Sequence, residues 1–268
     1  MKKKTSAGLA LVVILGAGAA YYYWQEERPA PVAPPVPVVA PPPPAPAAAA
    51  PTIRHPIQAA PASTAAAVPP LPTLAKSDAA MLGELAAWFG ERPLATLFYS
   101  DRIITRIVAT IDNLPRPMAP VGMMPVKPAP GAFITAAGSD GPVISPDNWA
   151  RYAPYVALAQ AVDAKKLVDF YVRFYPLFQQ AYEELGYPKG YFNDRLIETI
   201  DDLLAAPEIS DPIKLVQPKV LYQFADPKLE ALSAGQKIMI RMGAANAAKV
   251  KAKLAEIRAL VVARTGRR

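Results

Sequence analysis

Four acidic side chains in the second half of the sequence have the types and spacing for acid/base chemistry. They are Glu183, Glu184, Glu198 and Asp201. Side chains three or four residues apart share one face of a helix, and two carboxyl groups hydrolyse a glycosidic bond when one is protonated and the other ionised. These acids are therefore candidate catalytic groups of a glycan hydrolase. However, Arg195 lies three residues before Glu198, and this spacing favours a solvent-exposed face of ion pairs. We expect no metal site among them.

A second group of candidates consists of aromatic side chains just before these acids. Tyr171, Tyr175 and Tyr182 recur at helical spacing beside a stripe of phenylalanines. Aromatic faces stack on sugar and proline rings, and phenol hydroxyls fix the orientation of a ligand. These residues are therefore candidates for a groove that binds a glycan or a peptide. The alternative is that their rings complete the hydrophobic core and leave their hydroxyls at its rim.

The third candidate is the basic end of the chain. Residues 238–268 contain eight lysines and arginines but only one acid. Four of the basic residues flank an apolar helical stripe and are candidates for binding a partner: Lys249, Lys251, Lys253 and Arg258. Such side chains reach anionic headgroups or polymers, which would suit an anionic envelope surface or an acidic protein. The alternative is a terminal helix that packs on the domain through its apolar stripe and leaves its charges in water.

Composition excludes several kinds of site. The 268 residues include no cysteine and a single histidine, His55, which lies in a proline- and alanine-rich stretch that we do not expect to fold. A folded domain without either residue has no disulfide, thiol nucleophile, Ser-His-Asp triad or histidine-ligated zinc. The sequence also contains no phosphate-binding glycine loop and no nucleophile elbow. We therefore expect no cofactor, and we favour a protein that is not an enzyme.

The elements that must position these residues are mainly helices. We expect a single, mainly α domain over residues 74–268, with at most one or two small β-hairpins. Apolar side chains recur at helical spacing, bounded by capping residues, prolines or glycines, in seven segments. They are 79–89, 94–114, 145–162, 163–185, 193–206, 233–242 and 246–264. Residues 132–136 and 142–145 flank a glycine-containing turn and predict a hairpin. Residues 213–226 fit either a strand or a helix.

The beginning of the chain predicts a membrane anchor. Residues 1–4, which include three lysines, form a basic tail, and residues 5–24 are uncharged and long enough for a transmembrane helix. Lysines stay on the cytoplasmic side, and the aromatic residues 21–24 suit the opposite membrane interface. The alternative is a cleaved signal peptide, because residues 17–20 are small and resemble a cleavage site. An uncleaved signal anchor fits the long segment that follows it.

Residues 25–73 predict a disordered, proline- and alanine-rich linker. Half of the 32 prolines fall between Pro29 and Pro72, mostly among alanines and valines. Proline lacks an amide donor and fixes φ, and small side chains bury too little apolar area to order the chain. We expect a semi-rigid, partly polyproline-II spacer, which at about 3.1 Å per residue reaches at most ~140 Å.

Several motifs of the domain resemble a known bacterial family. They lie at residues 174–187, 222–230, 233–237 and 241–243, with Asn246 after them. Together they are similar to the envelope family catalogued as domain of unknown function 3014, over roughly residues 80–265. The resemblance implies a bacterial protein with an N-terminal membrane segment and a soluble domain outside the cytoplasm. It implies no activity and transfers no functional residues.

These observations favour a single-pass protein of the bacterial inner membrane with its C-terminal domain in the periplasm. We expect a non-enzymatic protein, of function otherwise unknown, whose domain binds or scaffolds a protein or cell-wall partner. The alternative is a tethered cell-wall hydrolase that uses the paired carboxylates. We exclude nucleic acid as a partner, because the predicted topology places the basic end of the chain outside the cytoplasm. The sequence leaves the oligomeric state open.

Overall fold

A computed structural model describes residues 52–57, 70–209 and 212–265. The chain divides into two units, residues 1–49 and 50–268, and every described residue belongs to the second unit. The predicted cytoplasmic tail (1–4), the predicted transmembrane helix (5–24) and much of the linker lie outside the described residues. Among the helices that are described, none is both long and apolar enough to cross a membrane.

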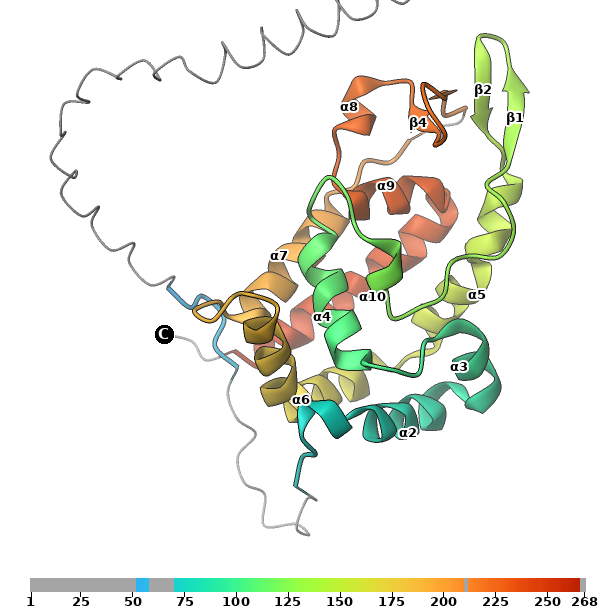
Figure 1. Ribbon diagram of the computed structural model, residues 1–268. Helices are drawn as coiled ribbons and strands as arrows, with labels where there is room; N and C mark the ends of the chain where they lie inside the picture. The colour runs from blue at the N-terminus through green and yellow to red at the C-terminus, as the bar shows by residue number, and fades with distance from the viewer. Residues whose placement is uncertain (1–51, 58–69, 210–211, 266–268) are drawn as a thin grey trace, which may run out of the picture. The chain divides into compact units, whose positions relative to one another are not determined.

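The second unit is mainly helical and carries two small antiparallel hairpins, as the sequence predicts (Figure 1). The α-helices are α2 (Asp78–Phe89), α3 (Glu91–Leu97), α4 (Ile103–Asn113), α5 (Asp147–Ala161), α6 (Ala164–Glu184), α7 (Phe192–Leu204), α8 (Pro227–Glu230), α9 (Ala234–Arg241) and α10 (Ala244–Ala263). The 3-10 helices are η1 (Leu74–Lys76) and η2 (Val121–Met123). The strands are β1 (Thr135–Gly138), β2 (Gly141–Ile144), β3 (Leu215–Val216) and β4 (Gln223–Phe224).

Several helix boundaries follow from local signals in the sequence. The Asp163 carboxylate accepts a hydrogen bond from the backbone N–H of Lys166 at 2.9 Å and caps α6. The Ser233 hydroxyl caps α9 in the same way. Such side-chain oxygens satisfy N–H groups that have no partner within the helix. The predicted starts of these two helices are therefore confirmed.

The predicted helix over residues 94–114 is wrong as a single element. The structure has α3 and α4 instead, because Arg102 adopts the left-handed region with a φ of 48° and the helix cannot continue through it. The carboxylate of Asp78, in α2, accepts hydrogen bonds from the N–H groups of Arg102 and Ile103 at 2.7 and 2.8 Å. The cap of α4 thus comes from another helix, which local periodicity does not reveal.

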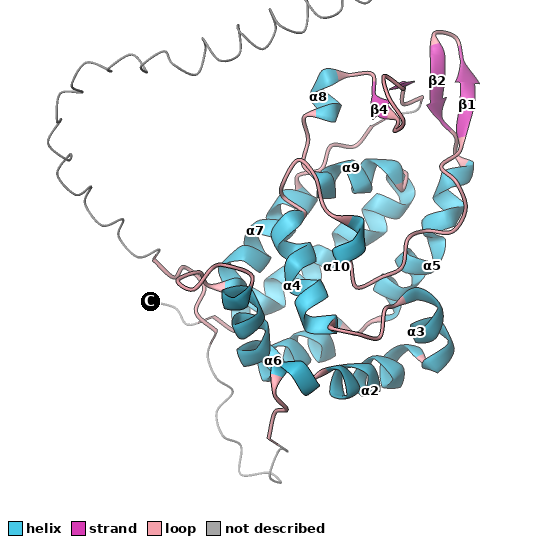
Figure 2. Cartoon of the chain, viewed as in Figure 1, coloured by secondary structure: helices cyan, strands magenta, loops and turns pink. Residues whose placement is uncertain are grey.

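Both hairpins lie at one end of the unit (Figure 2). In the first, Thr135 pairs with Ile144, as the glycine-containing turn predicts. Within residues 213–226 the structure contains strands, with Leu215 paired to Phe224, so the helical alternative for this segment is wrong. The N–H of Ile144 donates to the carbonyl of Ile213 and joins the two hairpins.

The helices α6 and α7 lie at the centre of the packing, because each contacts both α4 and α10. Buried aromatic and aliphatic side chains from α2, α4, α6 and α7 form the largest core cluster. Phe174 and Phe192 are among its most buried members. The turn between α6 and α7 is thereby held on the core, and its neighbours Tyr191 and Asp194 remain half-buried.

Candidate functional site

The four predicted catalytic acids all lie exposed on the surface. Glu183 and Glu184 each accept a hydrogen bond from a glutamine one turn earlier in α6. Glu198 pairs with Arg195 at 3.0 Å, which confirms the predicted ion pair, and Asp201 pairs with an arginine of α10. Acid/base catalysis by two carboxyl groups needs environments that separate their pKa values. All four acids are instead solvent-exposed and bonded to neighbouring polar side chains.

The three candidate tyrosines all lie on α6 but differ in exposure. Tyr171 and Tyr182 are buried, whereas Tyr175 is half-buried. The hydroxyl of Tyr171 donates to Oδ1 of Asn193 at 3.0 Å, and Tyr182 stacks on Tyr187 with ring centroids 4.6 Å apart. Burial raises the pKa of Tyr171 and Tyr175, so their phenols remain neutral hydrogen-bond donors. Two of the three rings therefore complete the core, and Tyr175 lies at its edge.

Residues 52–57 of the predicted linker are bound to the domain (Figure 1, blue segment). This finding corrects the expectation of a disordered linker at these six positions, which we call the arm segment. The reason is a set of hydrogen bonds to residues more than 130 positions away, together with the side chain of Ile57, which packs against the largest core cluster. Neither contact can be inferred from linker composition.

The carboxylate of Asp194 binds the middle of the arm segment. Its Oδ2 accepts from the N–H of Arg54 at 3.0 Å and its Oδ1 from the N–H of His55 at 2.7 Å. The chain bends at these two residues, and this bend lets both N–H groups face one carboxylate. Asp194 lies in the first turn of α7, where the helix dipole favours a negative charge. Hydrogen bonds to a charged acceptor are also the stronger kind.

Two neighbours of Asp194 complete the contact. The Nδ2 of Asn193 donates to the carbonyl of His55 at 2.8 Å, and the hydroxyl of Tyr191 accepts from the N–H of Ile57 at 2.7 Å. Asn193 is fully buried and also accepts from the buried hydroxyl of Tyr171, which orients its amide. The ring of Tyr191 lies 5.6 Å from that of Tyr175. We call Tyr191, Asn193 and Asp194 the clamp. Two of the predicted tyrosines, Tyr171 and Tyr175, thus contact the clamp from the side of the core.

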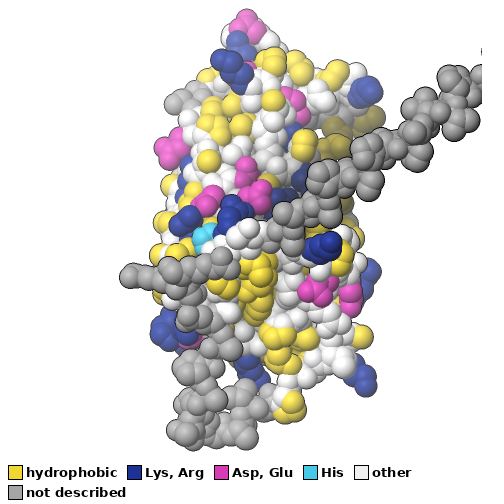
Figure 3. Space-filling model, turned by 90° about the vertical axis from the view of Figure 1, so that its left-hand side faces the viewer, with side chains coloured by type: hydrophobic (Ala, Val, Ile, Leu, Met, Phe, Trp, Pro, Cys, Tyr) yellow, Lys and Arg dark blue, Asp and Glu magenta, His cyan; other side chains and the backbone are white. Residues whose placement is uncertain are grey.

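Salt bridges hold the first turns of α7 against α4. Arg195 approaches the buried carboxylate of Asp112 at 3.2 Å, and Arg116 approaches the same group at 2.7 Å. A buried carboxylate requires such partners, because an unpaired buried charge is strongly destabilising. The orientation of the clamp is therefore set by α4 and α6 together. Figure 3 shows the face that carries the single histidine, with acidic and basic side chains close to it.

The clamp lies within a region that a family model matches. The family described as "Protein of unknown function (DUF3014)" matches residues 103–258, more than half of the chain. The chain belongs to this family. The resemblance predicted from the motifs of the domain is therefore confirmed. No curated protein and no solved structure was found to match the chain.

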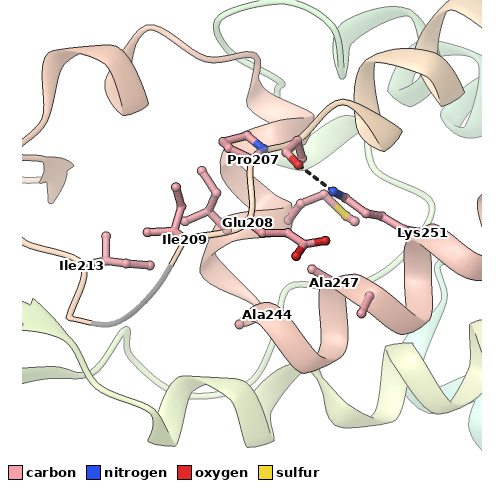
Figure 4. Close-up of a pocket in the computed structure, with 12 residues that line it drawn as sticks. Pro207, Glu208, Ile209, Ile213, Ala244, Ala247 and Lys251 are labelled. Atoms are coloured by element: carbon pink, nitrogen blue, oxygen red, sulfur yellow. Dashed lines mark hydrogen bonds between the residues drawn. The ribbon is translucent and has the colours of Figure 1, made fainter.

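The four basic candidate residues of α10 lie near the C-terminal end of the matched DUF3014 region. Lys251 Nζ donates to the carbonyl of Ala206, just after α7, at 2.6 Å, as Figure 4 shows. Lys253 Nζ donates to the carbonyl of Val162, the C-cap residue just after α5, at 3.0 Å. Arg258 makes a two-pronged contact with Asp201, and Lys249 is exposed. Cations near helix C-termini satisfy free carbonyls and suit the helix dipole. Two of the four candidates therefore cap neighbouring helices.

A small pocket lies beside the Lys251 contact (Figure 4). Its lining includes Pro207, Glu208, Ile209, Ile213, Ala247 and Lys251. Its cavity volume of about 20 Å³ is room for a single water molecule. The described residues contain no group of three acids or histidines arranged to hold a metal ion. Lys251 and Lys253 therefore connect α10 to neighbouring helices. The pocket beside Lys251 is too small for a ligand larger than water.

The clamp residues themselves were not predicted from the sequence. The predicted helix over residues 193–206 begins at Asn193, but its position alone indicates no role in binding. One signal was available: Arg54, His55 and the two isoleucines 53 and 57 are the only residues of their kinds between Pro29 and Pro72. A short run of unlike residues within a low-complexity linker indicates a segment with a partner.

Proposed function

We propose that this protein is a membrane-tethered, non-enzymatic protein of the bacterial envelope whose periplasmic domain binds a peptide segment of a protein partner. The observation that carries the proposal is the clamp. A carboxylate, a buried amide and a phenol hydroxyl converge on the main chain of one short segment, through four hydrogen bonds of 2.7–3.0 Å. A binding site of this kind serves to hold a chain in place.

The tether is proposed from the sequence alone. A basic tail (1–4), an uncharged stretch of membrane-spanning length (5–24) and a proline-rich linker precede the domain. This order of anchor, spacer and domain suits a protein that reaches for a partner at a distance from the membrane. By the same order, the domain lies on the side of the membrane opposite to the basic tail.

The chemistry of the clamp favours a protein over a glycan as the partner. Two successive N–H groups bound by one carboxylate, followed by a carbonyl bound by an amide, are a pattern that a polypeptide main chain supplies. The four acids considered for glycan hydrolysis lie exposed and bonded to polar neighbours, so they give the hydrolase alternative no support. We therefore propose a protein partner.

The topology is tested with reporters fused after residue 73 of the full N-terminal segment. A reporter that works only outside the cytoplasm should be active, and one that works only inside should be inactive. The opposite pattern would overturn the membrane-tethered half of the proposal. Deleting residues 5–24 serves as the control, because without this stretch the outside reporter should lose its activity.

Peptide binding is tested by crosslinking in cells. Lys189 is exposed and lies two residues before Tyr191, so a photoreactive amino acid in its place reports on the clamp without altering it. We expect a discrete adduct that disappears when Asp194→Ala is added. Glu198→Ala, which removes an exposed acid of the same helix, is the matched control and should leave the adduct unchanged. An adduct that is absent, or that does not depend on Asp194, would contradict the binding half of the proposal.

A further inference from the structure

We infer that the clamp recognises segments in which two residues with free amide N–H groups precede a proline and a large aliphatic residue. We also infer that the chain's own residues 54–57 are a resident ligand that a partner segment displaces. This inference rests on the proposed function and names the class of partner. It is read from the register of the contacts and from the sequence of the linker.

The contacts select for main-chain atoms at particular positions. Asp194 requires amide N–H groups at Arg54 and His55, and Tyr191 requires one at Ile57. Proline at any of these three positions would remove a donor. Position 56 donates nothing to the clamp, and the chain has Pro56 there. The side chain of Arg54 is exposed, so the amino acid at this position is free to vary as long as it is not proline.

The apolar requirement comes from the last residue of the segment. Ile57 packs against the largest core cluster and pairs in an antiparallel bridge with Thr265. A small or polar side chain here would leave that contact unfilled. Within residues 25–73, four windows offer the three amide donors around a proline: 27–30, 49–52, 54–57 and 59–62. Only 54–57 ends in a large aliphatic residue, so the linker contains one segment of this class.

The arm segment is bound at the surface, where exchange is feasible. Its first residues are exposed and its last three are half-buried, and it lies at the edge of the core. Segments with few buried contacts open at lower free energy than the core does. A covalently attached segment on a short connection has a high effective concentration. A partner segment of the same class must therefore compete with residues 54–57 for the same clamp.

The experiment uses the full chain in detergent micelles and a labelled, end-capped peptide with the sequence of residues 52–57. A variant with Arg54→Pro and Ile57→Ser frees the clamp, because it removes one amide donor and the aliphatic side chain. If the attached segment occupies the clamp about nine-tenths of the time, the freed variant binds the peptide about tenfold more tightly than the natural chain. Adding Asp194→Ala to the freed variant should abolish binding, whereas adding Glu198→Ala should not. A peptide with proline in place of arginine should not bind.

Each result decides one part of the inference. Equal affinity of the freed variant and the natural chain would overturn the role of residues 54–57 as a resident ligand. Failure of the freed variant to bind, with its thermal melting by circular dichroism unchanged, would overturn the recognition class. Binding of the proline-substituted peptide would do the same. The crosslink from position 189 separates these results from the proposed function: an Asp194-dependent adduct that persists means that the clamp binds a segment of another class.

Discussion

The start of α7 and the helix α10 both carry polar side chains suited to binding, yet these side chains have different partners. At α7, Asp194 and its neighbours bind a segment that lies far away in the sequence. On α10, Lys251 and Lys253 bind carbonyls at the ends of α7 and α5, inside the same helical unit. The charge of a residue therefore does not identify a binding surface. What distinguishes the two regions is whether the partner is the end of a neighbouring helix or a separate segment of the linker.

The largest expected effect on the packing of α10 against its neighbouring helices comes from Gly243→Ala. Gly243 has a φ of 85°, and a Cβ there would lie 2.7 Å from the ring of Trp149. We expect the free energy of unfolding to fall by about 2–4 kcal/mol, since both the backbone and the ring must shift. Urea denaturation measures the change.

The matched control for Gly243→Ala is Gly83→Ala. Gly83 lies in α2, and a Cβ there would meet nothing within 4 Å. Because alanine favours a helix, this change should stabilise the protein by about 0.5–1 kcal/mol. A similar response at both positions would show that α10 does not depend on its contact with Trp149.

The corresponding test at the start of α7 is Tyr171→Phe, because Tyr171 contacts the clamp residue Asn193. The hydroxyl of Tyr171 bonds to the fully buried Asn193, so its removal leaves a buried acceptor without this donor. We expect a loss of about 1–3 kcal/mol in unfolding free energy. Tyr175→Phe is the control, because Tyr175 is only half-buried, and it should cost less. If both changes cost the same, the link between the core and the clamp through Asn193 is not a stabilising one.

Alkaline pH should lower the free energy of unfolding, because Tyr171 is buried. Burial holds the pKa of Tyr171 well above its ordinary value of 10.0, so above pH 10 the unfolded chain loses this proton while the folded chain keeps it. Stability is therefore retained below pH 10 and falls above it, by about 1.4 kcal/mol per pH unit for this group. Denaturation between pH 9 and 11 tests this slope. The slope should be smaller in Tyr171→Phe; an unchanged slope would contradict the assignment.

The sequence predicted the elements whose ends are marked locally. Asp163 and Ser233 cap the helices that follow them, and the glycine-containing turn produced the first hairpin. It also identified Tyr171, Tyr175 and Tyr182 as a group, and the first two of these residues contact the clamp. In each case the information is contained within a few neighbouring residues.

The features that the sequence did not predict depend on distant partners. The break between α3 and α4 is stabilised by Asp78, and the arm segment is bound by Asp194, about 140 positions away. Periodicity and composition describe a residue's neighbours along the chain and not its partners in space. The contacts of Lys251 and Lys253 could not be predicted for the same reason, because their acceptors are carbonyls that follow other helices.

A smaller effect is expected from Lys251→Met, which removes the donor to the carbonyl of Ala206. Ala206 is buried, so its carbonyl has little access to a water molecule that could replace the lysine. We expect a loss of about 1–2 kcal/mol. Lys249→Met is the control, since Lys249 is exposed, and it should change stability by less than about 0.5 kcal/mol. Equal changes would remove the distinction between a capping lysine and a surface lysine on α10.

Among the contacts tested, the smallest effect is expected for that of Arg258, whose partner Asp201 is itself solvent-exposed. Its side chain retains 38% of its surface and that of Asp201 retains 47%, so water screens their attraction. Arg258→Ala should lower the unfolding free energy by no more than about 1 kcal/mol. A double-mutant cycle with Asp201→Asn measures the coupling directly and should return about 0.2–1 kcal/mol. A coupling above that range would mean that the pair fastens α10 to α7 as firmly as a buried contact. A value within it means that Arg258 can exchange its partner at little cost to the fold.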